Sequence, residues 1–451
     1  MDKKRFLIGL DIGTSAVKGA LVGEDARVIC TKSAPFEYII EGEGRFLDPE
    51  GFVSACESVI KALADVSPEP PSALCSCCAS GNPVFLDENM KPLTPIIGWQ
   101  TKVSQEDLDK VYTEKEQKDL YRVCGWPLGH GMPAANLAYL SVHEPEILKK
   151  TAFMAMSAEY LNFRLTGNWG LSHSMATPSY LTDQKNGVWN LPLIKRFGLD
   201  ETKLPPIFPK GTVLGEVTDE AAQSLGLSRG AKVVLGTFDH PSGAMGAGVL
   251  EEGDLLLSCG TSWVELFPVP DRDFALSTGG LVDRFLIHGA PWCVMKSLTS
   301  VTEKINALRE GFFGVIPHRE FDGMVGEAPL GCGGLRFNFD ADDKERAKGF
   351  EKHFIARAII EGAALLLKEN LEKLKTCGLR AERITAIGGI TNSPICTRVL
   401  GEVIGQDVKT VNGQSAGAVG SALLAGMGIG LYGSEKEAFE KMSRAAEKEK
   451  H

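Results

Sequence analysis

Long hydrophobic runs, blocks of basic residues and a P-loop are all missing from this chain of 451 residues. No stretch approaches the roughly 18 uninterrupted apolar residues of a membrane-spanning helix, so we expect no membrane partner. The formal net charge is -10 and lysine and arginine form no stripe, which argues against a nucleic-acid partner. The pattern GxxxxGK[ST] is absent, so a nucleotide would have to be held by another element.

The eleven cysteines form no spaced framework, and most lie inside apolar stretches. The cluster Cys75-Ser76-Cys77-Cys78 has no histidine nearby, and neighbouring residues of a strand point to opposite faces, which disfavours a shared metal ion. Reduced, buried thiols are the simpler interpretation. Because such thiols suit the cytosol, we expect a cytoplasmic protein.

The length indicates two or three domains rather than one core. Apolar residues make up 43% of the chain and charged residues 24%, as in a globular enzyme. Strand and helix patterns alternate, which predicts an α/β fold with a domain boundary near residues 241–250. We expect strands at 6–10, 16–22, 74–79, 84–86, 233–237, 254–259, 263–266 and 384–387, and helices at 50–65, 352–375, 416–427 and over most of 102–165, with a charged helix at the end of the chain.

Two strand-turn-strand segments carry the same tripeptide, Gly13-Thr14-Ser15 and Gly260-Thr261-Ser262. Each is typical of a β-hairpin, and together they suggest an internal duplication. Backbone N–H groups and hydroxyls in such turns can hold phosphate, with Lys18 adding a charge, and Asp11 can hold hydrated Mg²⁺. The alternative is an ordinary turn, in which the same residue types are common.

Asp239 follows an apolar strand and precedes small residues. Strand ends in open α/β sheets face the ligand crevice, so this carboxylate is well placed to take a proton from a substrate hydroxyl. Asp239 could also cap the helix that follows it, and the two roles are compatible. The neighbouring His240 could contact substrate or be structural.

A third motif, Gly388-Gly389-Ile390-Thr391-Asn392, joins a strand to a helix. Paired glycines let a flat base lie against the backbone, and the Asn392 amide can bond an adenine edge. The alternative is a plain turn capped by an Asn or Ser.

Taken in series, these motifs resemble the FGGY family of carbohydrate kinases, of the xylulokinase and glycerol kinase type. The resemblance runs the length of the chain through Asp11 to Ser15, Phe46 to Pro49, Arg164 to Gly167, Gly236 to Gly248, Cys259 to Ser262, Arg357 to Gly362, Gly388 to Asn392 and Gly417 to Ala422. It implies two actin/hexokinase-like (ribonuclease H-like) domains with an interdomain cleft. The implied domains are residues 1–242, with the sugar site and first hairpin, and residues 243–451, which bind ATP.

The resemblance also implies roles for single residues. Asp239 would be the catalytic base, and Asp11 would position Mg²⁺ through water. The phosphates of ATP would meet Gly13, Thr14, Ser15, Gly260 and Thr261, and the adenosine would lie near Gly388, Gly389, Asn392, Ser415 and Gly417. A homodimer is a further expectation from the family alone.

The sequence departs from the family pattern in the segments with which family members recognise the sugar. The loop Ser80-Gly81-Asn82 is shorter than usual, Trp99-Gln100-Thr101-Lys102-Val103 lacks the usual acid and arginine, and Glu159 stands in place of an aspartate. We therefore expect a ketose or polyol acceptor near Asn82, Trp99 and His240, without naming the sugar. A non-catalytic sugar-binding pseudokinase and a kinase for a non-sugar acceptor stay open as alternatives.

Overall fold

Two six-stranded sheets share one arrangement of strands in the computed structural model, which describes residues 4–79, 81–260, 262–411 and 415–448. In both sheets, a strand pairs antiparallel with the next strand on one side and parallel with a much later strand on the other. The order β3-β2-β1-β6-β15 in the first sheet therefore matches the order β19-β17-β16-β20-β21 in the second. Both predicted hairpins are confirmed, and they occupy equivalent places.

The first sheet consists of β1 (Phe6–Ile12), β2 (Ala16–Gly23), β3 (Val28–Pro35), β6 (Ala73–Cys78), β14 (Val213–Glu216) and β15 (Lys232–Phe238). The second consists of β16 (Asp254–Cys259), β17 (Trp263–Val269), β18 (Leu281–Arg284), β19 (Trp292–Leu298), β20 (Arg383–Gly388) and β21 (Val408–Thr410). The central strands are apolar on both faces because helices cover both sides.

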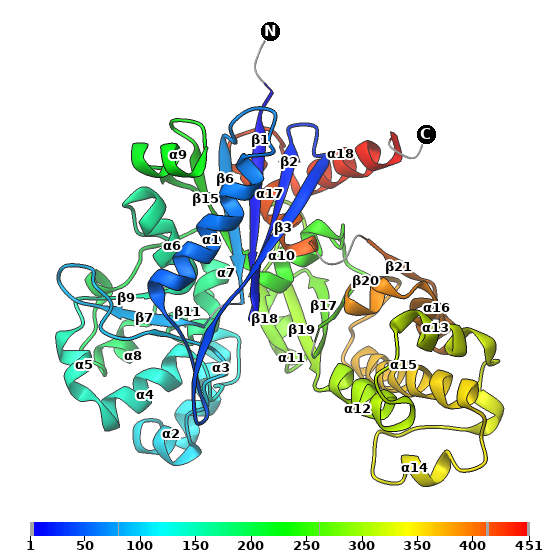
Figure 1. Ribbon diagram of the computed structural model, residues 1–451. Coiled ribbons are helices and arrows are strands. Elements are labelled where there is room, and N and C mark those ends of the chain that lie inside the picture. Colours follow the sequence, from blue (N-terminus) through cyan, green and yellow to red (C-terminus); the bar gives the residue numbers. More distant parts are fainter. Residues whose placement is uncertain (1–3, 80, 261, 412–414, 449–451) are drawn as a thin grey trace.

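Helices α10 (Asp239–Gly246) and α17 (Ala416–Gly428) lie against each other between the two sheets (Figure 1). Glycines allow this close approach, because a Cβ atom on Gly246 would lie 2.0 Å from the carbonyl oxygen of Ala416. Helix α17 packs on β1 and β6 of the first sheet although it comes late in the chain. The boundary at residue 242 stays a prediction, and α17 returns to the sheet on the other side of it.

Besides α10 and α17, further helices belong to each half of the chain. In the first half these are α1 (Pro49–Ala64), α2 (Gln105–Val111), α3 (Glu114–Cys124), α4 (Pro133–His143), α5 (Pro145–Lys150), α6 (Ser157–Thr166), α7 (His173–Ala176), α8 (Leu191–Lys195) and α9 (Asp219–Leu225). In the second half they are α11 (Arg272–Ser277), α12 (Val301–Phe313), α13 (His318–Glu327), α14 (Asp343–Arg346), α15 (Lys352–Thr376), α16 (Pro394–Ile404) and α18 (Glu435–Lys448).

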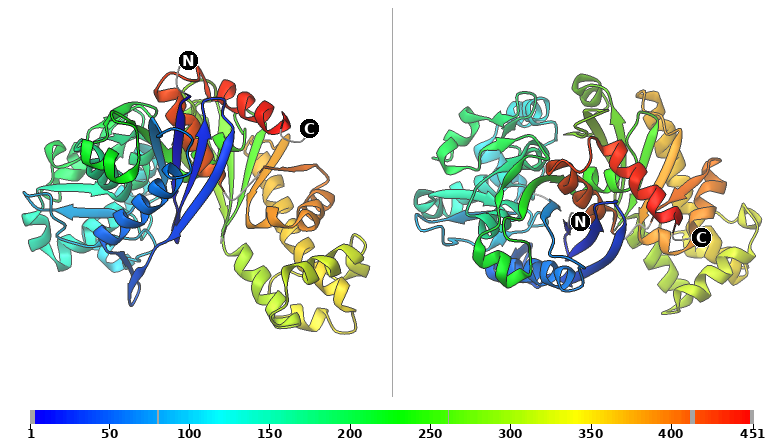
Figure 2. Two further views of the ribbon diagram at one scale, coloured as in Figure 1. Left: turned by 45° about the horizontal axis from the view of Figure 1, so that its top comes forward. Right: turned by 90° about the horizontal axis from the view of Figure 1, so that it is seen from above.

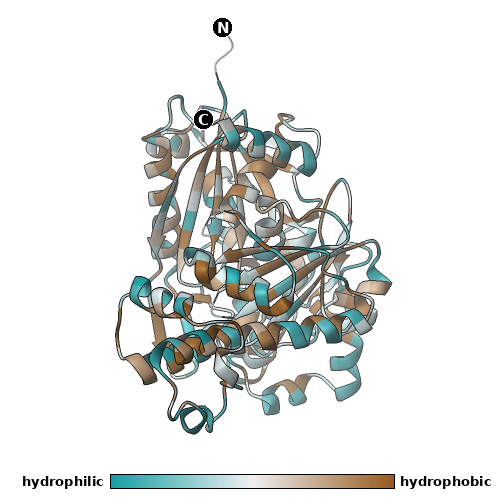
Figure 3. Ribbon diagram, turned by 90° about the vertical axis from the view of Figure 1, so that its right-hand side faces the viewer, coloured by the Kyte–Doolittle hydropathy of each residue, from teal (hydrophilic) through white to brown (hydrophobic). Residues whose placement is uncertain are grey.

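The cyan lobe of the first half and the yellow lobe of the second lie on opposite sides of the central sheets (Figure 2). Hydrophobic residues concentrate along the central strands, whereas hydrophobic and hydrophilic residues alternate along the outer helices (Figure 3). Among the described residues, no helix has the length and apolar character needed to cross a membrane.

Residues 102–165 are mostly helical, as expected, but residues 153–156 within them form strand β9 (Phe153–Met156), which was not predicted. This strand pairs antiparallel with β7 (Pro83–Leu86), and all four of its residues are buried. Pairing and burial outweigh the helix propensity of Met and Ala, because propensity is a weak preference that tertiary context overrides.

Candidate active site

Asp239 is the first residue of α10, directly after β15. Its side chain is 24% exposed, so it can be reached from solvent. Its Oδ1 accepts the backbone N–H of His240 at 2.7 Å, while the His240 ring nitrogen Nε2 lies 4.0 Å away. The interpretation of Asp239 as the helix cap is wrong by one position: Phe238 is the N-cap residue and makes no side-chain cap bond.

Asp11 lies near the end of β1, and its carboxylate is close enough to Asp239 for the two charges to repel each other. Burial and, to a smaller extent, the charge of Asp239 raise the pKa of Asp11 to about 6, while Lys18, its partner across the hairpin, acts to lower it. The Cys77 thiol donates to Asp11 Oδ1 at 3.7 Å. Two neighbouring carboxylates with only one lysine beside them form a donor set that suits a hydrated magnesium ion.

Gly417 lies against Asp11. A Cβ atom at this position would be 2.8 Å from Asp11 Oδ2, so only glycine leaves the carboxylate undisturbed. Ser415 is the N-cap residue of α17 and makes no side-chain cap bond. The start of α17, predicted to lie near the nucleotide, therefore lies beside the carboxylate predicted to position the metal.

The first Gly-Thr-Ser turn is closed by a hydrogen bond of 3.0 Å from Gly13 N–H to the carbonyl of Ala16. Thr14 Oγ1 accepts the indole N–H of Trp99 at 3.0 Å, and Ser15 is exposed. Lys18 is also exposed, opposite Asp11 in the hairpin register. Because the Trp99 indole takes up a lone pair of Thr14, the hydroxyl proton of Thr14 stays available to another acceptor.

The second turn lies beside the paired glycines. Strand β16 runs parallel to β20 with Cys259 opposite Gly388, and Gly388 has φ 89°. A Cβ atom on Gly388 would lie 2.5 Å from the carbonyl oxygen of Cys259, so the close approach requires glycine. Gly260 is exposed and its carbonyl accepts the Thr302 hydroxyl at 2.6 Å, whereas Thr261 lies outside the described residues.

Gly389 and Asn392 form a single 3₁₀ turn (Gly389–Asn392) before helix α16. Ser393 caps that helix by accepting the backbone N–H of Cys396 at 3.1 Å. Of the two residue types expected to cap this helix, asparagine and serine, it is the serine that does so. The predicted role of Asn392 at an adenine edge stays a prediction.

Two residues predicted to lie near the sugar, Asn82 and Trp99, are linked by hydrogen bonds to the first Gly-Thr-Ser hairpin. Asn82 is buried, its Oδ1 accepts the backbone N–H of Trp99 at 2.8 Å, and its Nδ2 donates to Ala79 at 2.6 Å. Both ends of the Asn82 amide are thus engaged by main chain, and Trp99 in turn reaches Thr14. The structure brings Asn82 and Trp99 to the first hairpin, and their contact with a sugar stays a prediction.

Sequence reasoning gave no role to Ser174 and treated Glu159 only as a departure from the family. Glu159 is buried, its Oε2 has no hydrogen-bond partner, and desolvation raises its pKa to about 8. Ser174 is fully buried and accepts the backbone N–H of Phe238, the residue before Asp239, at 3.0 Å. Ser174 does not stand out by spacing, since its partners Phe238 and Asp283 come from distant parts of the chain.

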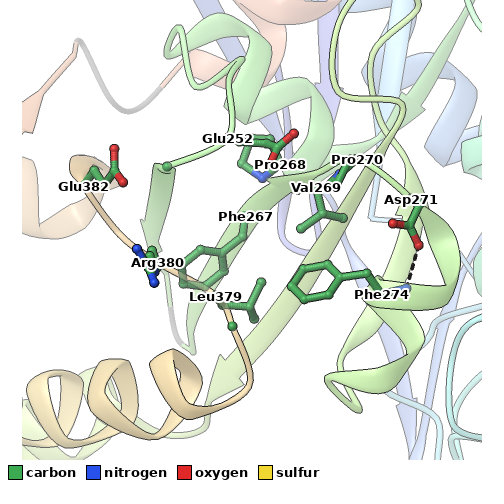
Figure 4. A pocket seen from close by; sticks show the side chains of 12 residues that line it. Glu252, Phe267, Pro268, Val269, Pro270, Asp271, Phe274, Leu379, Arg380 and Glu382 are labelled. Atoms are coloured by element: carbon green, nitrogen blue, oxygen red, sulfur yellow. Dashed lines mark hydrogen bonds between the residues drawn. The ribbon is translucent and has the colours of Figure 1, made fainter.

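A separate pocket of about 410 Å³ lies in the second half of the chain, where β17 and the residues after α15 meet (Figure 4). Figure 4 shows the Phe267, Phe274 and Leu379 side chains along it, with Glu252, Arg380 and Glu382 to one side. It includes none of the predicted site residues, so this hollow and the candidate active site are different places.

Comparison with solved structures identifies the fold. A xylulose kinase from Rhodospirillum rubrum superposes with a TM-score of 0.83 at 22% identity, covering 98% of this chain and 96% of that one. A glycerol kinase from Plasmodium falciparum, solved with ADP, gives 0.83 at 16% identity, covering 99% and 96%. The chain therefore has the two-domain, actin/hexokinase-like α/β fold of these structures.

The chain belongs to the FGGY family of carbohydrate kinases, whose N-terminal domain matches residues 6–246 and whose C-terminal domain matches residues 338–429. It is similar to a xylulose kinase of Bacillus subtilis, with 26% identity over 98% of this chain and 92% of that protein. It is also similar to an autoinducer-2 kinase of Yersinia enterocolitica, with 25% identity over 97% and 89%. The protein is thus an enzyme of the sugar-kinase type, in a family that uses ATP.

Proposed function

We propose that this enzyme transfers the γ-phosphoryl group of ATP to a hydroxyl of a ketose or polyol, with Asp239 as the general base. The observation that carries the proposal is the proximity of two carboxylates. Asp11 lies near the end of β1 and Asp239 directly follows β15, another strand of the same sheet. One carboxylate is partly exposed and free to take a proton, and the other is suited to a cation. Xylulose kinases among the similar proteins support a ketose acceptor.

Phosphoryl transfer requires alignment and charge stabilisation more than covalent help. Asp239 would accept the proton of the attacking hydroxyl as the new bond forms, which is typically worth about 10²–10⁴-fold. Thr14 would donate its hydroxyl proton to a phosphate oxygen, since the bond accepted from Trp99 occupies one lone pair and leaves the proton available. Gly13, Ser15, Gly260 and Thr261 would add donors around the same phosphates.

Magnesium fits the two carboxylates. Asp11 would hold the ion through water, and Asp239 would lie in reach of it. The positive charge of Lys18 would offset part of the negative charge of the carboxylates. When bound, the ion neutralises charge on the transferring phosphoryl group. The N-terminal end of α17, at Ser415 and Gly417, and the turn at Gly388, Gly389 and Asn392 would hold the nucleotide on the other side.

The decisive experiment combines one substitution with one substrate screen. ADP release is measured across ketoses, polyols, aldonates and deoxysugars, and Asp239→Asn is expected to abolish turnover on the best acceptor while calorimetry shows nearly unchanged ATP binding. Asp65→Asn is the matched control, because it makes the same change at a side chain that is 58% exposed at the end of α1.

Two outcomes would redirect the proposal. Turnover retained by Asp239→Asn removes this residue from the role of base. Sugar binding without product in the wild type favours a pseudokinase, and ATP consumption with carboxylates instead of sugars favours a non-sugar acceptor. A cytoplasmic location and a homodimer stay predictions.

A further inference from the structure

The Ser174 hydroxyl connects the residue before Asp239 to the second sheet. Ser174 lies on the short helix α7 and is completely buried. It donates to Oδ2 of Asp283 at 2.7 Å and accepts the backbone N–H of Phe238 at 3.0 Å. A single hydroxyl therefore joins a carboxylate of the second half of the chain to the main chain at Asp239.

Asp283 is a fully buried residue of β18. Its Oδ1 accepts the Thr177 hydroxyl at 3.2 Å and the backbone N–H of Arg284 at 2.7 Å. Burial raises the pKa of Asp283 to about 7, and the bonds from Ser174, Thr177 and the backbone, with the charge of Lys210, oppose this rise. Above that pH the group is a carboxylate that can only accept hydrogen bonds.

This chemistry fixes the direction of the Ser174 hydroxyl. A serine has one hydroxyl proton and two lone pairs, and here the proton is given to Asp283. Only lone pairs are left to face Phe238, so the hydroxyl must act as an acceptor for its N–H. Without Asp283 the proton could turn toward Phe238, where two donors would oppose each other.

The main chain at Phe238 depends on this acceptor. The register between β15 and β6 shifts between Leu235 and Phe238, so the regular ladder is interrupted just before Asp239. Phe238 is the N-cap residue of α10 and has no side-chain cap bond. The Phe238 N–H instead bonds Ser174, which ties the start of α10 to α7.

The other end of the link is held against the first half of the chain. The Val282 N–H donates to the carbonyl of Gly125 at 2.9 Å. Its own carbonyl accepts the Trp126 indole N–H at 3.0 Å and the Gln184 amide at 2.6 Å. Strand β18 therefore carries Asp283 to Ser174 while remaining part of the second sheet.

We propose that Asp283 and Ser174 are positioning residues for phosphoryl transfer. The carboxylate of Asp283 orients the serine hydroxyl, which holds the Phe238 amide and thereby fixes the orientation of the Asp239 side chain. This inference rests on the proposed function of Asp239 as the base. It makes the geometry at Asp239 depend on how β18 of the second sheet is seated against the first half. Neither residue touches the reacting atoms, so their effect is on alignment.

The test compares Ser174→Ala and Asp283→Asn with Thr177→Val at pH 8, above the pKa of Asp283. Thr177→Val is the matched control, because it removes a hydrogen bond to Asp283 and leaves both bonds of Ser174 intact. We expect kcat to fall by about 10–100-fold in the first two variants, since small misplacements of a catalytic group cost this much. The KM for ATP should stay within about twofold, and the control should keep most of its kcat.

A double-mutant cycle separates positioning from a loss of stability. If Asp283 acts through Ser174, Asp283→Asn has no further effect on kcat in the Ser174→Ala background. If the fold-changes in kcat of the two single variants multiply in the double variant, the two residues act independently and the inference is overturned. A decrease in kcat of the same size in Thr177→Val would also overturn it. Thermal unfolding of all variants checks that the compared proteins are folded.

Hydrogen–deuterium exchange gives a readout that needs no sugar. Peptides that contain the Phe238 amide should exchange faster in Ser174→Ala and Asp283→Asn than in the wild type or Thr177→Val. Unchanged exchange in Ser174→Ala overturns the inference even if the enzyme phosphorylates a sugar. A wild type that phosphorylates no sugar refutes the proposed function instead, and the exchange comparison then still decides whether the link exists.

Discussion

The hydroxyl of Ser242 donates a hydrogen bond of 2.8 Å to the carbonyl oxygen of Gly417. Ser242 belongs to the helix that begins at Asp239, and Gly417 belongs to the helix that lies on Asp11. This contact therefore ties together the two helices that place the two carboxylates. The acid pair is held by helix packing between distant parts of the chain as well as by the sheet.

Asp11→Asn tests the magnesium site. Removing one charge of the pair weakens cation binding, so we expect a higher Mg²⁺ concentration for half-maximal activity and a lower kcat. Magnesium titration of ADP release measures both. Asp65→Asn is the control, because Asp65 is 58% exposed at the end of α1. An unchanged magnesium requirement in Asp11→Asn contradicts the assignment.

Gly417→Ala tests the contact with Asp11. The added Cβ would lie 2.8 Å from Oδ2 of Asp11 and must displace the carboxylate, so we expect kcat to fall by about 10-fold or more. The free energy of unfolding should be affected less than kcat, because alanine is a better helix former than glycine by about 1 kcal/mol. Gly323→Ala is the matched control in α13, where an added Cβ has nothing within 4 Å. Full activity of Gly417→Ala would show that the contact does not matter.

Trp99→Phe tests the bond to Thr14. Phenylalanine keeps an aromatic ring but loses the indole N–H, so the Thr14 hydroxyl loses its fixed direction. A net hydrogen bond is worth about 0.5–1.5 kcal/mol, which corresponds to roughly 2–10-fold in kcat/KM for ATP. Initial rates at varied ATP measure this. Trp189→Phe, which removes an indole bond to Pro205 instead, should leave the ATP parameters unchanged.

Glu159→Gln tests the buried carboxyl. Desolvation raises its pKa from 4.5 to about 8 in the folded protein, so between these values folding takes up a proton and stability falls as pH rises. Glutamine stays neutral. The variant should therefore be more stable than the wild type, and the gap should widen toward pH 8 by at most about 1.4 kcal/mol per pH unit.

Denaturant unfolding at pH 5.5, 7 and 8 follows that gap between Glu159→Gln and the wild type. Glu146→Gln is the control, since the Glu146 side chain is 69% exposed. Parallel pH curves for wild type and Glu159→Gln would mean that Glu159 stays ionised in the fold.

Much of the fold was predictable from local patterns. The spacing of apolar residues at 50–65 and 352–375 predicted helices that the structure confirms as α1 and α15. The two turns flanked by apolar runs predicted both hairpins. These elements obey short-range rules, since a turn or an amphipathic period is complete within a few residues.

The sequence by itself determined that this chain forms two related hairpins, carries an acid after a buried strand, and follows the motif order of the FGGY family. The tertiary structure alone decided that α17 returns to the first sheet, that Gly417 meets Asp11, and that Asp283 reaches Phe238 through Ser174. The same holds for β9, whose partner strand is β7. The physical reason is that such contacts join residues far apart in the chain, so their energies depend on the packed fold and leave no periodic trace in the sequence.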